Sequence, residues 1–281
     1  LKPKRPVCNF RSVHVPLPIA MSTGTWRIIY HDVPFKGRAE FVRLILEDAG
    51  VAYEESSDNL YGPSGVCDAF RAMGSDEDGL AAGAEQHVAA DTAVWPVMFP
   101  PILHHKPSGD GEEVYVNQTP AILRYCAAQL GYVPETPAQA AKADQITLNV
   151  NDLFAECNQA FHPKDPKASY DSQKEEADKV SKAWAGGRLL VWLGHFEKVV
   201  KRLCPEGGGP LFGKMSYADI ALFHALDAVE AQFSSSDYGE AWLKADVPTL
   251  KKWKTWFAGR SQLKGYFGSE RRKGWQGTSM M

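Results

Sequence analysis

Residues 97–123 read VMFPPILHHKPSGDGEEVYVNQTPAIL. Two short apolar runs, PILHH and EEVYV, flank a turn of Pro, Ser, Gly and Asp, and this pattern predicts a β-hairpin. The second run leads into a helix that we expect over 118–130, with Gly131 as its stop. Pro100 and Pro101 lie where the first strand begins, although proline has no amide hydrogen for a strand ladder. The pair indicates either a proline-initiated edge strand or a fixed bend.

A β-α-β pattern precedes this hairpin. Residues 26–31 (WRIIYH) are β-branched and aromatic, which predicts a strand, and 37–50 place apolar residues at helical spacing. A second strand is expected over 51–57. Residues 58–96 are rich in small and acidic residues without periodicity, so we predict an inserted surface loop with space for one short helix. The predicted order up to residue 132 is β-α-β-α-β-β-α.

The second half of the chain is predicted to be helical throughout. It follows a proline-rich linker at 132–137. Helices are expected at 138–161, 172–204, 216–233 and 248–258. We therefore predict a flexible leader at 1–25, an α+β domain at 26–132, an all-helical domain at 138–262 and a tail at 263–281.

The bulk composition excludes several classes of protein. At 281 residues, with 44% hydrophobic and 23% charged residues, the chain can form one large or two ordinary globular domains. A formal net charge of −3 argues against broad electrostatic binding to nucleic acid. No apolar run reaches the roughly 18 residues that span a membrane. The five cysteines contain no CxxC pair, which predicts unbridged thiols and a cytoplasmic location.

The leader at 1–25 is basic, with four Lys or Arg residues and no Asp or Glu. This composition is compatible with an organelle transit peptide, in which case the location would be an organelle. It is also compatible with a flexible segment upstream of a start at Met21, which is our expectation.

Residues 208–216 (GGPLFGKMS) resemble a phosphate-binding loop, but Met215 stands where such a loop has Ser or Thr, and a helix rather than a strand precedes it. Ser216 is followed three residues later by Asp219, the spacing of a helix capping box. We therefore predict a structural role for Ser216 and Asp219. The scattered histidines and cysteines show no metal-ligand spacing, so no metal site is predicted.

Four motifs occur in an order and spacing that resemble the glutathione transferase family. They are GRAEFVRLILEDAGVAYEE (37–55), PIL (101–103), VNQTPAILRYCAAQLG (116–131) and PLFGKMSYADIALFHAL (210–226). The resemblance covers roughly residues 26–258. It implies a thioredoxin-like domain followed by an all-α domain.

The resemblance also implies a binding site for glutathione. A cis-proline before the third strand turns backbone groups toward the extended tripeptide, and Pro101 matches that position, with Pro100 as the alternative. If Pro101 is cis, Pro100 offers the ligand a carbonyl but no amide hydrogen. Gln118 and Thr119 lie at a helix N-terminus, which favours the γ-glutamyl carboxylate. For the glycine end, Trp95, Arg71 and Lys106 are candidates among which the sequence does not choose.

A donor that stabilises the glutathione thiolate is expected at the end of the first strand. Tyr30 is the candidate, and His31 is the alternative. The first loop is longer than in the tyrosine-type members of the family, and counting back from the helix brings Asp32 near the expected position, where its charge would oppose a thiolate. No Ser, Thr or Cys lies between Tyr30 and Gly37.

The resemblance implies an enzyme of detoxification that conjugates glutathione to small hydrophobic electrophiles. Glutathione would be its co-substrate, with no metal or redox cofactor, and the family pattern implies a homodimer. One alternative is a non-catalytic binding or docking module on the same fold. Another is thiol exchange or isomerisation, although thiol exchange usually has a cysteine near the position of Tyr30.

Overall fold

The computed structural model describes residues 24–31, 33–56, 95, 97, 100–166, 168–275 and 280. The leader up to residue 23, Asp32, Arg71 and the predicted insertion apart from Trp95 lie outside the described residues. Three cysteines are described, Cys126, Cys157 and Cys204, and these three are free thiols, as predicted.

The N-terminal domain contains a four-stranded mixed sheet of order β2-β1-β3-β4. Strand β1 (Gly24–Ile29) pairs in parallel with β2 (Glu54–Ser56) and antiparallel with β3 (Ile102–Pro107). Strand β3 also pairs antiparallel with β4 (Val114–Asn117), which completes the predicted hairpin. Helix α1 (Glu40–Asp48) makes the crossover between the two parallel strands.

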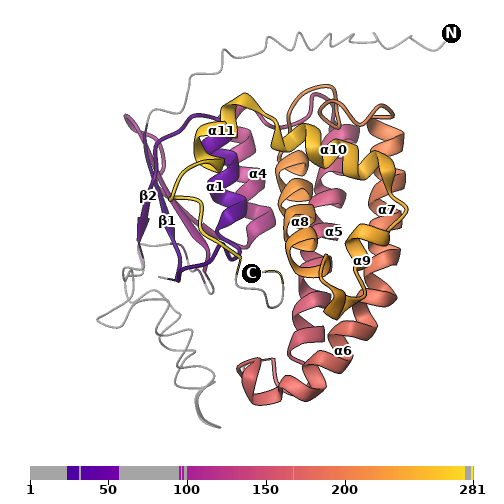
Figure 1. Cartoon of the computed structure of the whole chain (residues 1–281). Coiled ribbons are helices and arrows are strands. Elements are labelled where there is room, and N and C mark those ends of the chain that lie inside the picture. Colours follow the sequence, from indigo (N-terminus) through magenta and orange to yellow (C-terminus); the bar gives the residue numbers. More distant parts are fainter. Residues whose placement is uncertain are drawn as a thin grey trace, which may run out of the picture.

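The side chains of β1 alternate between the two faces of this sheet, as the period of a strand requires. Trp26 and Ile28 belong to the main apolar core, whereas Ile29 packs with Ile102 in a second cluster. Helix α1 and helix α4 (Thr119–Leu130) contribute to the main core and contact each other (Figure 1). The sheet is therefore held to the rest of the molecule through α1 and α4.

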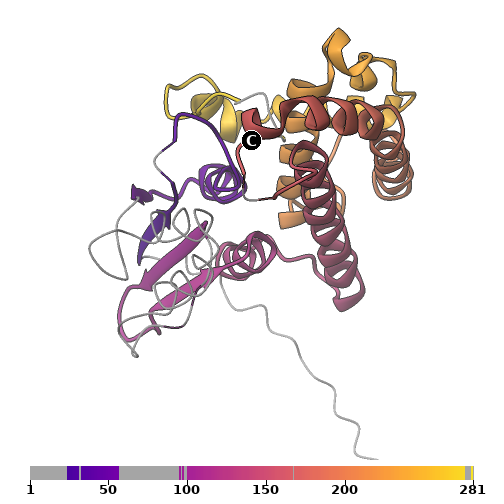
Figure 2. The same ribbon diagram turned by 90° about the horizontal axis from the view of Figure 1, so that it is seen from below.

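The regular secondary structure described in the C-terminal domain consists of helices. Its elements are α5 (Pro137–Phe161), η1 (Asp171–Gln173), α6 (Lys174–Gly186), α7 (Arg188–Leu203), α8 (Tyr217–Phe233), η2 (Ser236–Tyr238), α9 (Ala241–Lys244), α10 (Pro248–Ala258) and α11 (Ser261–Phe267). Helix α8 is buried on almost every side and contacts both α5 and α1. The view from below shows the helices standing to one side of the sheet (Figure 2). This arrangement confirms the predicted fold class.

Several predicted boundaries were wrong in detail. The helix expected over 172–204 is divided at Gly187, whose φ of −129° and ψ of −81° do not continue a helix, into α6 and α7. Strand β1 begins at Gly24, inside the predicted leader. Helix α11 crosses the boundary predicted at residue 262, and α9 was not predicted.

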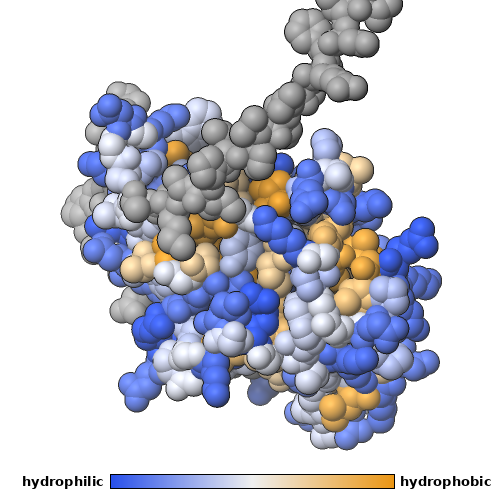
Figure 3. Space-filling model, turned by 90° about the horizontal axis from the view of Figure 1, so that it is seen from above, coloured by the Kyte–Doolittle hydropathy of each residue, from blue (hydrophilic) through white to orange (hydrophobic). Residues whose placement is uncertain are grey.

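On the face seen from above, apolar residues appear as separate patches among hydrophilic ones (Figure 3). Among the described residues, no helix combines the length and the apolar character that crossing a bilayer requires.

Candidate active site

One cleft of about 600 Å³ lies where the end of β1, the segment before β3, the start of α4 and one side of α5 meet. It brings together all five residues that the sequence predicted for glutathione: Tyr30, Pro100, Pro101, Gln118 and Thr119. These residues come from three separate segments of the chain. The sheet pairing is what makes them neighbours.

Tyr30 directly follows β1 and is 7% exposed. Its hydroxyl oxygen accepts a hydrogen bond from the backbone amide of Arg38 at 3.1 Å, just before α1 begins. Gly37 makes this approach feasible, because it has a φ of +55° and a Cβ there would lie 2.4 Å from the phenol oxygen. The Gly37-Arg38 pair thus places the phenol beside the N-terminal end of a helix.

The cis peptide bond lies between Pro100 and Pro101. Pro101 is therefore a cis residue, the first of the two alternatives. On the paired strands, Ile102 lies opposite Asn117, so Pro101 and Gln118 follow one step beyond the ladder. The backbone of the proline pair and the start of α4 consequently form facing walls of the cleft.

Gln118 precedes α4 and has a φ of +68°, a conformation that residues other than glycine adopt uncommonly. Its side chain is exposed, whereas Thr119, the first residue of the helix, is 6% exposed. The unpaired amides of a helix N-terminus and the helix dipole favour an anion at this end of the cleft.

Four further polar residues of the cleft were not among the predicted site residues: Arg38, Asn151, Asn158 and His162. The last three are spaced by seven and four positions on α5 and its C-terminal end, which places them on one helical face. That spacing is a signal in the sequence, but it identifies a site only once α5 is known to border the cleft.

Arg38 is half-buried, and its Nη1 donates to Oδ1 of Asn151 at 3.0 Å. Desolvation by burial lowers the pKa of Arg38. No carboxylate among the described residues forms an ion pair with it. A guanidinium in this setting makes the cleft electropositive and favours ligands that accept hydrogen bonds.

Two hydrogen bonds determine which donors and acceptors the α5 side of the cleft presents to a ligand. Because a guanidinium only donates, Asn151 must turn its oxygen to Arg38, which leaves its NH₂ group for a ligand. His162 has its Nδ1 3.0 Å from the carbonyl oxygen of Ala168, so Nδ1 carries the proton and Nε2 accepts in the neutral ring. Asn158, which lies between Asn151 and His162 in the sequence, is half-exposed and adds a further side-chain amide to the cleft.

Of the other residues considered from the sequence, His31 lies at the cleft, and Trp95 and Lys106 do not line it. His31 also lines the cleft, and its ring centroid lies 5.1 Å from that of Tyr30. Trp95 is 72% exposed and Lys106 lies exposed on β3, and neither is among the described residues that line the cleft. Among the residues that the structure describes, no group of His, Cys, Asp and Glu is arranged to hold a metal ion.

Ser216 and Asp219 form the capping box at the start of α8, away from the cleft. The Ser216 amide donates to Oδ2 of Asp219 at 2.9 Å, and the Leu211 amide donates to Oδ1 at 2.8 Å. Burial raises the pKa of Asp219 to about 6. The carboxylate joins the preceding loop to α8, which is a structural role.

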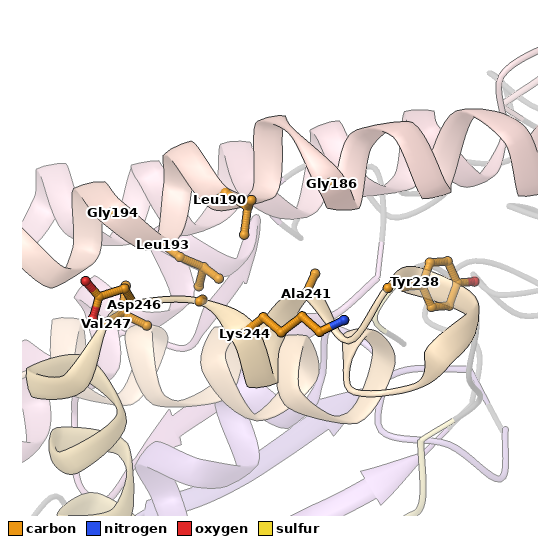
Figure 4. Close-up of a pocket in the computed structure, with 11 residues that line it drawn as sticks. Gly186, Leu190, Leu193, Gly194, Tyr238, Ala241, Lys244, Asp246 and Val247 are labelled. Carbon is orange, nitrogen blue, oxygen red and sulfur yellow. The ribbon is translucent and has the colours of Figure 1, made fainter.

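A second pocket, of about 350 Å³, lies in the helical domain. Leu190 and Leu193 extend from α7 toward Ala241 on α9, and Lys244 lies along its edge (Figure 4). Lys244 pairs with Glu240 at 3.0 Å. This pocket contains none of the predicted site residues.

The sequence of this chain is similar to sequences of known proteins. Residues 160–270 match the family model described as glutathione S-transferase, C-terminal domain. A glutathione S-transferase of Plasmodium falciparum (isolate 3D7) is 24% identical over 238 residues, which cover 81% of this chain and 95% of the relative.

Solved structures show the same fold. The Pi-class glutathione S-transferase of Onchocerca volvulus is 22% identical with a TM-score of 0.56, and covers 86% of this chain and 92% of its own. The sigma-class enzyme of Fasciola hepatica is 20% identical with a TM-score of 0.57, and covers 87% and 95%. The matched C-terminal domain, the curated relative and the shared fold agree with the four motifs. Residues 160–270 therefore match a glutathione S-transferase C-terminal domain, and the chain as a whole has the glutathione S-transferase fold.

Proposed function

We propose that this protein is a glutathione transferase that conjugates the glutathione thiolate to small electrophiles. The observation that carries the proposal is the convergence of Tyr30, the cis-proline pair and the Gln118-Thr119 helix start on one cleft. The tyrosine hydroxyl would contact the thiol of glutathione, the backbone bend at the cis-proline would contact its peptide groups, and the helix N-terminus would contact its carboxylate.

In this proposal glutathione lies extended along the backbone at Pro100 and Pro101, as an added strand would. Its γ-glutamyl carboxylate binds Gln118 and the amide end of α4, where charge-assisted hydrogen bonds are strong. Arg38, half-buried without a carboxylate partner among the described residues, adds positive charge on the same side.

Tyr30 has the catalytic role in the proposed reaction. A free thiol has a pKa of about 8.5, so only a small fraction is thiolate at neutral pH. Donation from the Tyr30 hydroxyl to the sulfur stabilises the charged form and lowers the thiol pKa. The thiolate then forms a C–S bond, and either a leaving group departs or an adjacent carbon gains a proton. The reaction uses glutathione as co-substrate and has no step for a metal or a redox cofactor.

The second substrate occupies the part of the cleft bordered by Phe35 and α5. Phe35, Pro166 and Ala168 provide apolar contacts for a hydrophobic electrophile. The amides of Asn151 and Asn158 add donors that favour an electrophile with an acceptor oxygen, such as a conjugated carbonyl or a nitroarene. Negative charge builds up on that oxygen as the thiolate attacks, and donors there stabilise it. A homodimer, a cytoplasmic location and a role in detoxification stay predictions.

The test is isothermal titration of the full chain with glutathione, repeated on Gln118→Ala. The site predicts measurable binding by the wild type and a loss of about tenfold or more in the variant, equal to about 1.4 kcal/mol. Matched Gln159→Ala, an exposed residue of α5, should bind like the wild type. Absence of binding by the wild type at millimolar glutathione would exclude the proposed reaction.

One observation favours a second candidate, a non-catalytic docking module. The residue before cis Pro101 is Pro100, which has no amide hydrogen to donate to the cysteinyl carbonyl of glutathione. If that missing bond prevents glutathione binding, titration of the wild type with glutathione detects no heat. The Pro100→Ala variant regains the amide hydrogen, so it should bind glutathione if the missing donor is the only obstacle.

A further inference from the structure

The C-terminal end of the described chain returns to the loop between β1 and α1. We call residues 272–275 the strap and residues 33–37 the first loop. The amide of Lys36 donates to the carbonyl oxygen of Gly274 at 3.0 Å, and Phe35 and Gly274 form a parallel bridge. Lys273 donates through Nζ to the carbonyl oxygen of Val33 at 2.9 Å. Both bonds end on main-chain atoms of the first loop, so they constrain its backbone.

Trp275 provides a third contact between the strap and the first loop. The ammonium group of Lys36 lies 4.4 Å from the centroid of the Trp275 ring. Lys36 is 5% exposed, and desolvation followed by the charge of Arg272 lowers its pKa. No carboxylate among the described residues forms an ion pair with Lys36, so the ring face is a principal partner of a buried cation. The same ring also stacks on His224 of α8, with centroids 5.4 Å apart.

The strap is itself tied to both domains. Arg272 pairs with Asp227 of α8 at 2.8 Å and with Glu40 of α1 at 3.4 Å. Figure 1 shows the yellow C-terminal segment running back from α11 past the indigo part of the chain, to end between the sheet and the helices. A segment anchored on the helical domain thus reaches across to the loop of the other domain.

The first loop also borders the cleft. Phe35 lines the cleft together with Tyr30, and the loop ends at Gly37 and Arg38, whose amide donates to the Tyr30 hydroxyl. The loop therefore contacts both the strap and the predicted catalytic phenol. A displacement of the backbone at Lys36 would move the amide at Arg38, two residues away.

We propose that Lys273 and Trp275 are positioning residues of the active site. They hold the first loop so that the Arg38 amide meets the Tyr30 hydroxyl and Phe35 forms one wall for the electrophile. This role goes beyond the proposed conjugation, and only its kinetic readout rests on that function.

Hydrogen exchange tests the proposal without any assumption about activity. In the full-length Trp275→Ala variant, the amides of Lys36 and Arg38 should exchange about tenfold faster than in the wild type, because the opening that exposes them costs less. Trp275→Phe retains an aromatic face and should restore slow exchange. Trp256→Ala is the control: its ring contacts Trp253 and Phe257 within the helical domain, so it should lower the melting temperature without affecting these two amides.

The milder Lys273→Ala variant keeps the Trp275 ring and removes only the hydrogen bond to Val33. It replaces Trp275→Ala in the exchange experiment if that variant does not fold. It should speed exchange at Lys36 and Arg38 by about threefold.

Kinetics give the second readout. Gln118 and Thr119 lie on α4 and not on the first loop, so Trp275→Ala should bind glutathione within about threefold of the wild type while kcat falls about tenfold. The pH at which the rate is half-maximal should rise, because the thiolate is less well stabilised. Unchanged exchange at Arg38 in a folded Trp275→Ala or Lys273→Ala variant would overturn the proposal. If the wild type binds no glutathione, the proposed function is wrong. The hydrogen-exchange rates of Lys36 and Arg38 would still test the role of the strap.

Discussion

The Nη1 atom of Arg38 donates to Oδ1 of Asn151 at 3.0 Å, which joins the loop before α1 to the middle of α5. This bond crosses from the sheet domain to the helical domain between two residues that line the cleft. Because the amide oxygen of Asn151 accepts this bond, its NH₂ group is not used by Arg38. The two domains therefore contribute to one electropositive wall.

Arg38→Met should weaken glutathione binding by about tenfold or more, because it removes the charge while retaining most of the aliphatic volume. Titration calorimetry at two salt concentrations measures the effect, and the wild-type affinity should fall more with salt than that of the variant. Arg27→Met is a matched control, since Arg27 pairs with Glu54 on the exposed edge of the sheet. Equal loss in both variants would show that overall charge, not the site, is responsible.

Tyr30→Phe should lower kcat by about a hundredfold at neutral pH and leave the glutathione dissociation constant within about threefold. The phenol stabilises the thiolate, so without it the thiol pKa rises toward its ordinary value of about 8.5, and activity recovers as the pH is raised. A pH–rate profile from 6 to 9 (roughly spanning the thiol pKa) measures this shift. Tyr115→Phe on β4 should keep the wild-type profile. A Tyr30→Phe profile that is lower at every pH by the same factor would argue against thiolate stabilisation.

Asn158→Leu should change the choice of electrophile. Loss of a donor from the α5 wall is expected to reduce kcat/KM for a conjugated carbonyl or a nitroarene by about tenfold relative to an alkyl halide. The neighbouring exposed residue provides the control Gln159→Leu. The ratio of the two kcat/KM values is the readout, since it cancels differences in active enzyme. An unchanged ratio with activity intact would remove Asn158 from the electrophile site.

Asp219→Ala should lower the free energy of unfolding by about 2–5 kcal/mol, because it leaves the Leu211 and Ser216 amides buried without their acceptor. Urea denaturation of the two proteins gives the difference. The exposed Glu206 supplies the control Glu206→Ala, which should stay within about 0.5 kcal/mol of the wild type. A similarly small effect at Asp219 would mean that water replaces the carboxylate.

His224→Phe should raise stability, most of all in acid. The ring of His224 is fully buried, and neither nitrogen has a hydrogen-bond partner among the described residues. Desolvation and the nearby Arg272 and Lys36 charges hold its pKa well below the usual range. The unfolded chain therefore binds a proton below about pH 6.5 that the native state does not, so stability falls as the pH drops.

Phenylalanine removes both the unsatisfied nitrogens and the titration. Its advantage over the wild type should be about 1 kcal/mol near neutrality and should grow as the pH falls below about 6. Denaturation curves at a series of pH values measure it. A constant difference between the two proteins across that series would show that His224 does not titrate differently in the two states.

Several features of this protein follow from short-range patterns. The hairpin around Pro100 and Pro101, the β-α-β opening and the capping pair at Ser216 and Asp219 involve residues close in sequence. Their interactions depend on strand or helix periodicity and on local backbone chemistry. The same locality explains the error at Gly187: the apolar periodicity continues across it, and only the backbone angles end the helix.

By itself the sequence determined most of the described strands and helices, the order that gives this fold, and five residues that line one cleft. Local periodicity and family motifs record those properties. Tertiary structure alone decided the rest. Asn151, Asn158 and His162 become part of a site only when α5 packs beside the first loop, and Trp275 reaches Lys36 from about 240 positions away. Contacts at such separation depend on how whole domains pack, and no pattern within a few residues of the chain encodes them.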